Sequence, residues 1–123
     1  MSRDPRKLRV FALADELVIQ IYHETRSFPQ SERFGLQAQI RRAAVSVACN
    51  IVEGSARRTQ PEYVKFLHIA LGSASEARYL THLAGRLGFL EQTASRALTE
   101  RCGDLVRGLQ GLIDGLRRTG EAT

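Results

Sequence analysis

The stretch QIRRAAVSVACNIVEGSARR, residues 39–58, decides the fold, because it has helical spacing but carries apolar residues on two sides. At 100° per residue, one set of aliphatic side chains gathers on a single face of the helix. This set consists of Leu36, Ile40, Val47 and Ile51. A second set, Val45, Cys49 and Val52, lies roughly 150° away around the helix. The stretch therefore predicts a helix that is covered on both faces.

The second apolar face predicts a homo-oligomer. A helix in a monomeric four-helix bundle buries one face, and large exposed apolar patches are uncommon on soluble monomers. We therefore expect Val45, Cys49 and Val52 to form a subunit interface. The alternative is a helix that lies centrally within its own bundle, which four helices make difficult to arrange.

A polar stripe between the two apolar faces predicts an interhelix network. Because a buried polar group needs a partner, we expect Arg42 to pair with Glu53 or Glu76. Asn50 is then expected to bridge the backbone or Ser73. The full set of residues in this expected network is Arg42, Ser46, Asn50, Glu53, Ser73 and Glu76.

Apolar residues in the rest of the chain also repeat at alternating spacings of three and four. This rhythm predicts helices at about residues 8–27, 32–54, 60–87 and 93–118. Short loops between them predict an all-α, up-down-up-down antiparallel four-helix bundle, a single domain over residues 1–123. The expected core seams outside residues 39–58 are Phe11, Ala14, Val18, Ile21, Thr25 and Phe28; Phe66, Ala70, Ser73, Ala77, Leu80, Ala84 and Leu87; and Leu98, Cys102, Leu105, Leu109, Leu112 and Leu116.

Local signals predict where the helices begin and end. Ser31 is expected to cap the second helix, and Gly54 is expected to end it. Thr59 and Glu62 form a T-x-x-E capping box at the start of the third helix. Within that helix, Gly72 is expected to let another backbone approach closely.

The composition is typical of a globular protein with a basic surface. Hydrophobic residues make up 43% and charged residues 25%, and the net charge is +5. Sixteen of the eighteen cationic residues are Arg, a ratio that we attribute to codon bias, while the positive balance favours a polyanionic partner. The N-terminal apolar segment contains Asp15 and Glu16, so we expect no signal peptide, no membrane span and a cytoplasmic location.

The sequence contains no pattern typical of a catalytic or metal site. Cys49 and Cys102 match no metal-ligand spacing, and the three histidines, His23, His68 and His82, fall on different expected helices. The chain also lacks an ExxH motif, a phosphate-binding glycine loop and a GxSxG nucleophile motif. We therefore expect no cofactor, no metal and no enzymatic activity.

Arginine clusters supply the candidate contacts for a polyanion. Arg57 and Arg58 lie in the expected loop before the third helix, whose N-terminus also favours anions. Arg41 is open to either a structural or a binding role. The other candidates are Arg117 and Arg118 at the end of the last helix and the N-terminal arm of Arg3, Arg6, Lys7 and Arg9. Aromatic residues do not interleave with these cations, so we expect salt-sensitive backbone binding and not base stacking.

Three segments carry a resemblance to a known family: QIRRAAVSV, the N-I-x-E-G run that ends at Gly54, and FLHIALGSASE. Over roughly residues 8–116 the chain resembles the four-helix-bundle family encoded in intervening sequences of bacterial large-subunit ribosomal RNA genes. The same architecture is similar to the accessory protein of diversity-generating retroelements, which partners a reverse transcriptase and nucleic acid. The chain departs from the family pattern at Ala48, where proline is common, and at Val52, where alanine is common.

The resemblance implies a ring, usually a pentamer, and no established catalytic activity. It also implies a nucleic-acid role that rests on genomic setting and charge, without a defined site. We therefore expect a non-enzymatic, oligomeric bundle that binds RNA or DNA backbone, or a nucleic-acid-processing partner, through Arg-rich surfaces. The alternative is a protein–protein interaction scaffold whose basic charge is incidental.

Overall fold

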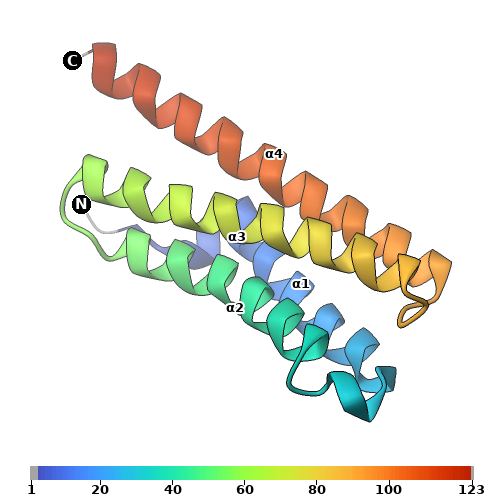
Figure 1. Cartoon of the computed structure of the whole chain (residues 1–123). Helices are drawn as coiled ribbons and strands as arrows, with labels where there is room; N and C mark the ends of the chain where they lie inside the picture. The colour runs from blue at the N-terminus through green and yellow to red at the C-terminus, as the bar shows by residue number, and fades with distance from the viewer. Residues whose placement is uncertain (1–2, 123) are drawn as a thin grey trace.

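The computed structural model describes residues 3–122, and over this range it contains four α-helices and no strand. The helices are α1 (Arg9–Glu24), α2 (Leu36–Ser55), α3 (Gln60–Arg86) and α4 (Gln92–Ala122). Successive helices run in opposite directions and surround one core (Figure 1). The expected all-α four-helix bundle is confirmed.

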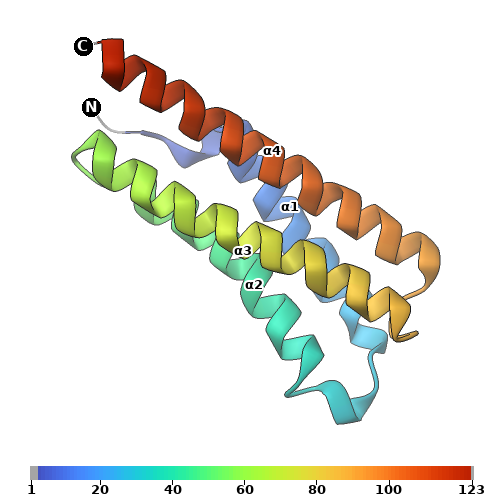
Figure 2. The ribbon, with the colours of Figure 1, turned by 45° about the horizontal axis from the view of Figure 1, so that its top comes forward.

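The antiparallel course gives the bundle two chemically different ends. Figures 1 and 2 show the N-terminal segment, the α2–α3 loop and the end of α4 at one end, which we call the terminal end. The α1–α2 and α3–α4 connections lie at the opposite end, which we call the turn end. Segments far apart in the sequence are therefore neighbours at the terminal end.

Each helix buries one line of apolar side chains, but the line is not always the expected one. In α1 the buried residues include Val10 and Leu17, whereas the expected Phe11 and Val18 are only partly buried. In α4, Ile113 is fully buried and Leu112 lies at the edge of the core. Adjacent apolar residues fit a spacing of three or four equally well, so spacing alone could not choose between them.

The core-facing side of α3 also differs from the expected seam. Leu67 and Ala74 are fully buried, while Phe66 and Ser73 are half-buried. Leu87, expected in the seam, is 54% exposed beyond the last turn of α3. The seven-residue pattern itself holds along α3, because the buried residues keep alternating steps of four and three; they are Tyr63, Leu67, Ala70, Ala74, Ala77, Thr81 and Ala84. The expected seam shares Ala70, Ala77 and Ala84 with this set and is one residue off at the alternate positions.

The second helix begins four residues later than expected. A 3-10 turn at Gln30–Glu32 precedes it, and α2 starts at Leu36. Ser31 is exposed and does not cap α2. Instead, the Glu32 carboxylate accepts a hydrogen bond of 3.0 Å from the backbone N–H of Leu36. A carboxylate suits this position because it satisfies a free N–H at the positive end of the helix dipole.

The glycine expected to end α2 instead lies inside it. The helix continues to Ser55, and Gly54 is buried against α3. A Cβ at Gly54 would lie 2.9 Å from the Cβ of Phe66 and 3.1 Å from Cδ1 of Tyr63. Gly54 therefore allows α2 and α3 to approach closely, the role that was expected of Gly72. A Cβ at Gly72 would meet no neighbouring atom of this chain within 4 Å, so that expectation is wrong for the single chain.

The Thr59 half of the capping box expected at the start of α3 is confirmed. Thr59 is the N-cap residue, and its hydroxyl accepts a hydrogen bond of 3.3 Å from the backbone N–H of Glu62. Pro61 lies in the first turn, where its missing N–H costs no helical hydrogen bond. Local chemistry therefore marks this helix start, and the contact between Gln60 and the carbonyl of Leu116 adds a tertiary tie.

Candidate functional site

The terminal end collects cationic side chains from three separate segments. These are the N-terminal arm, the α2–α3 loop and the last turns of α4 (Figure 1). Hydrogen bonds join the segments: Arg3 Nη1 donates to the carbonyl of Arg57 at 2.9 Å, and Gln60 Nε2 donates to the carbonyl of Leu116 at 2.8 Å. The cations of these three segments are Arg3, Arg6, Lys7 and Arg9 before and at the start of α1, Arg57 and Arg58 between α2 and α3, and Arg117 and Arg118 in α4. The fold therefore brings toward one end the three segments that carry these sequence-predicted residues, with a direct contact between Arg3 and Arg57, and Arg41 lies apart from them.

Two of these arginines are held in place by aromatic rings. The guanidinium of Arg3 lies 4.2 Å from the ring centroid of Tyr63, and that of Arg57 lies 4.9 Å from the ring centroid of Phe66. Burial raises the pKa of Tyr63 above its ordinary value, although the positive charge of Arg3 opposes the shift. Cation–π contacts leave the guanidinium charge intact, so both groups stay available to an anion.

Arg6 is the one terminal-end cation that the described side chains pair with a carboxylate. Its Nη2 lies 3.0 Å from Oδ2 of Asp4, and Asp4 also accepts from the backbone N–H of Arg6. The hydrogen bond from Arg6 lowers the pKa of Asp4, and the same contact raises the pKa of Arg6. The pair is exposed, and its charges largely cancel.

Five further cations at the terminal end are exposed and form no salt bridge with a carboxylate among the described side chains. They are Lys7, Arg9, Arg58, Arg117 and Arg118. Because charged side chains that are not neutralised keep their full field, this end attracts anions. The first turn of α3, next to Arg58, carries the acidic residue Glu62, which offsets the positive end of that helix dipole, so the attraction depends on the cationic side chains.

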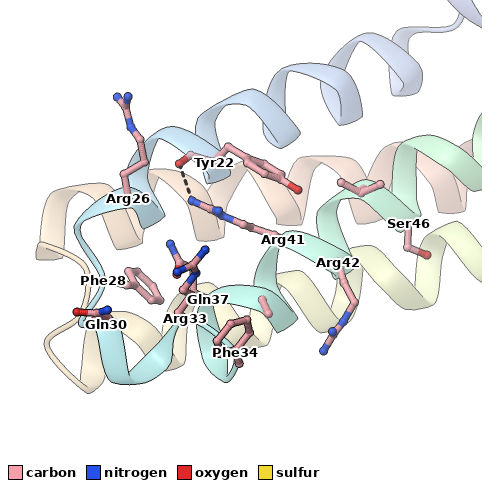
Figure 3. Close-up of a pocket in the computed structure, with 12 residues that line it drawn as sticks. Tyr22, Arg26, Phe28, Gln30, Arg33, Phe34, Gln37, Arg41, Arg42 and Ser46 are labelled. Carbon is pink, nitrogen blue, oxygen red and sulfur yellow. Dashed lines mark hydrogen bonds between the residues drawn. The ribbon is translucent and has the colours of Figure 1, made fainter.

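Arg41 lies at the turn end and joins α1 to α2. Its Nε donates to Oγ1 of the buried Thr25 at 2.9 Å. Its Nη2 donates to the carbonyl of Tyr22 at 3.3 Å, the dashed line in Figure 3. Its guanidinium also lies 4.5 Å from the Tyr22 ring centroid. Of the two roles that the sequence left open for Arg41, the geometry favours the structural one.

The polar stripe of α2 forms a smaller network than expected. Ser46 and Ser73 share a hydrogen bond of 2.8 Å between their hydroxyls, and Asn50 Nδ2 donates to the carbonyl of Ser46 at 2.8 Å. Glu76 accepts from Gln39 Nε2 at 3.5 Å.

The expected ion pair of Arg42 with Glu53 or Glu76 is not found among the described side chains. Arg42 is exposed, and among the described side chains no salt bridge joins it to Glu53 or Glu76. Figure 3 shows its guanidinium pointing away from Arg41. Arg42 remains in water, where an ion pair contributes little and holding two side chains together costs conformational entropy.

The candidate interface residues lie on an outer surface of α2. Val45 is half-buried, Cys49 is exposed, and Val52 is 43% exposed. The protein's own helices therefore leave this second apolar face uncovered, and the alternative of a central α2 does not describe the single chain.

A cleft at the turn end was not foreseen from the sequence. It has a volume of about 970 Å³ and lies between the end of α1 and the start of α2 (Figure 3). Its lining interleaves aromatic and cationic side chains; the residues are Tyr22, Arg26, Phe28, Gln30, Arg33, Phe34, Gln37, Ala38, Arg41, Arg42, Val45 and Ser46. The expectation that aromatic residues do not interleave with cations is wrong at this end. The adjacent pair Arg33-Phe34 was the available signal.

Other kinds of site find little support among the described residues. No three His, Cys, Asp or Glu side chains of the described part of the chain gather as metal ligands. Burial raises the pKa of the Cys102 thiol to about 11, partly offset by a hydrogen bond with Thr81, so the thiol is a poor nucleophile at neutral pH. None of the described helices has the length and apolar character needed to cross a bilayer.

The fold and its basic terminal end define a small, all-helical bundle protein. A family model described as "23S rRNA-intervening sequence protein" matches residues 6–111, and the chain belongs to this family. A crystal structure from Bacteroides thetaiotaomicron VPI-5482, of a protein with unknown function from the S23 ribosomal protein family, has the same fold with a TM-score of 0.79. It is 21% identical, and the match covers 85% of this chain and 97% of that chain. A comparison with curated proteins finds no match, and neither name states a catalytic activity.

Proposed function

We propose that this protein is a non-enzymatic, cytoplasmic binder of RNA or DNA backbone, and that it contacts phosphates through its terminal end. The observation that carries the proposal is the convergence of cations from three segments on one end of the bundle. Five of these cations form no salt bridge with a carboxylate among the described side chains. A surface of this kind suits a dense polyanion better than a single small anion.

Binding through this end would be electrostatic and largely independent of sequence. Each phosphate neutralised by Lys or Arg releases condensed counterions, so affinity falls as salt rises. The aromatic contacts of Arg3 and Arg57 restrict these two side chains before binding. Less conformational entropy is then lost when they contact phosphate.

We further propose that the protein assembles as a homo-oligomer, with a pentamer as the expected ring. The uncovered apolar face at Val45, Cys49 and Val52 supports self-association, because such a face is more stable when a second surface covers it. In a ring, the terminal ends of several subunits would act on one ligand, and multivalent contact raises overall affinity without new chemistry.

The test is a titration of labelled structured RNA and duplex DNA at about 50 mM and about 200 mM salt, with the particle mass measured first by light scattering. Changing Arg57 and Arg58 together to Ala should weaken binding and reduce the salt dependence. The matched control changes Arg96 and Arg101, two exposed arginines outside the terminal end, and should have a smaller effect.

Two results would count against the proposal. Equal losses from the two double substitutions would mean that net charge alone matters and that the terminal end is no site. No binding at low salt would remove the nucleic-acid function and favour the protein–protein scaffold.

A further inference from the structure

We propose that the cleft between α1 and α2 binds a nucleotide of an unpaired strand, with the base stacked on Phe34 and the phosphate contacted by the arginines of the rim. The inference rests on the proposed nucleic-acid function and adds a second, chemically different contact at the turn end. The terminal end would hold backbone only, whereas the cleft would also hold a base.

The cleft carries positive charge. Its lining includes four arginines and neither Asp nor Glu; the arginines are Arg26, Arg33, Arg41 and Arg42. No salt bridge among the described side chains joins any of the four to a carboxylate. Glu32, the neighbour of Arg33 in the chain, does not line the cleft, and its carboxylate, which keeps its charge, accepts from the backbone N–H of Leu36. The cleft is therefore complementary to an anion.

The cleft also presents an aromatic ring without a packing role. Phe34 is 86% exposed, although a phenyl ring in water stabilises no fold. The guanidinium of Arg33 lies 5.4 Å from its ring centroid, so the ring stands next to a positive charge. Phe28, by contrast, is buried and packs against Phe89, with the ring centroids 5.7 Å apart. Tyr22 is 42% exposed, but the Arg41 guanidinium lies 4.5 Å from its ring centroid, so Phe34 is the most accessible ring of the cleft.

One arginine of the cleft wall, Arg41, is held in place by contacts with α1, whereas Phe34 is exposed. Figure 3 shows Tyr22 and Phe34 toward opposite sides, with Arg41 and Gln37 drawn between them. Arg41 is fixed by Thr25 and Tyr22, so this part of the lining is rigid. The positive end of the α2 dipole is offset by the Glu32 carboxylate, which accepts from the backbone N–H of Leu36, so the positive charge of the cleft comes from its arginines.

These features match a nucleotide better than a simple anion. A free phosphate needs cations but no exposed ring, and an apolar ligand needs a ring but no arginines. A nucleotide has both a phosphate and a flat base, and base–aromatic stacking tolerates any base sequence. A paired base has its faces covered within the helix stack, so the cleft favours an unpaired strand.

The experiment uses Phe34→Trp as a reporter, because the chain contains no tryptophan. A decamer of unpaired RNA, or AMP at higher concentration, should quench its fluorescence, whereas ribose 5-phosphate, which lacks a base, should not. The control is Tyr79→Trp on α3, a 59% exposed position outside the cleft, which should show no quenching. Quenching by AMP alone would assign the cleft to free nucleotides and overturn the assignment to a strand.

A second variant tests the affinity without a new fluorophore. Because Phe34 is exposed, Phe34→Ala should leave the fold intact and weaken binding of the unpaired decamer at least about fivefold, the lower range for loss of one stacked base. Binding of a duplex should change less than about twofold, since a duplex offers backbone alone.

The outcomes separate this inference from the proposed function. Duplex binding that depends on Arg57 and Arg58, with no quenching by RNA, would overturn the cleft site and leave the proposed function intact. Absence of all nucleic-acid binding would overturn both. A change of particle mass in Phe34→Ala would mean that a second copy of the chain covers the cleft, which also overturns the inference.

Discussion

Replacing Gly54 by Ala should destabilise the protein, although Ala is ordinarily the better helix residue. The added Cβ would lie 2.9 Å from the Cβ of Phe66, whereas carbon atoms pack best at about 3.5–4.0 Å. The obstructing atom is attached to the backbone of α3 and cannot rotate away, so the two helices must separate. Overpacking of this kind costs about 1–3 kcal/mol, and the helix propensity of Ala returns about 1 kcal/mol.

Gly72→Ala is the matched control, because a Cβ at this exposed position in α3 would have no neighbouring atom of the chain within 4 Å. It should gain the same propensity term, about 1 kcal/mol, without the clash. The difference between Gly54→Ala and Gly72→Ala therefore isolates the clash, about 1–3 kcal/mol. The measurement is urea unfolding followed by circular dichroism at one protomer concentration, since assembly contributes to apparent stability. If Gly54→Ala is at least as stable as Gly72→Ala, close packing between α2 and α3 is not the role of Gly54.

The remaining predictions concern the thiols and the arginines of α2. At about pH 8 a thiol reagent should modify exposed Cys49 quickly and buried Cys102 only on unfolding. The pKa of Cys102 rises from 9.0 to about 11 on folding, so the thiol loses its proton at lower pH in the unfolded chain. The free energy of unfolding should therefore fall as pH rises from about 9 to 11. Cys102→Ala should remove this contribution, and a plot of unfolding free energy against pH with an unchanged slope would contradict it. Arg41→Ala should lower the free energy of unfolding by about 1–3 kcal/mol, because its hydrogen bonds are lost. Arg42→Ala, at an exposed position, should change it by less than about 0.5 kcal/mol. Equal effects of the two substitutions would contradict a structural role for Arg41.

The sequence predicts most where local chemistry determines the structure. The cap at Thr59 depends on residues three positions apart, and it forms as expected. The choice between Val10 and Phe11 for the core depends on the rotation of α1 against its neighbours, which apolar spacing does not specify. Gly54 shows the same limit, because the sequence does not distinguish a glycine that ends a helix from one that permits close packing between helices.

The candidate site was also only partly predictable from the sequence. Clusters of cations were visible in the sequence, but their meeting at one end depends on the antiparallel course of the helices. The role of Arg41 could not be assigned from the sequence, because it depends on the tertiary contact with Thr25. The cleft is not evident in the sequence, because α1 contributes Tyr22 and the connection before α2 contributes Phe34, on opposite sides of the cleft.

The two proposed contacts together restrict the kind of nucleic acid that one subunit could hold. The terminal end and the cleft lie toward opposite ends of the bundle, and α3, with 27 residues at about 1.5 Å each, sets their separation at roughly 40 Å. A duplex advances about 3.4 Å per base pair, so a ligand that reaches both ends needs about a dozen pairs. Because the cleft selects an unpaired base while the terminal end accepts any backbone, such a ligand would carry a paired stem with an unpaired end or loop. A stem of that length with an unpaired loop should therefore bind more tightly than the stem or the loop alone, and Phe34→Ala should abolish the difference.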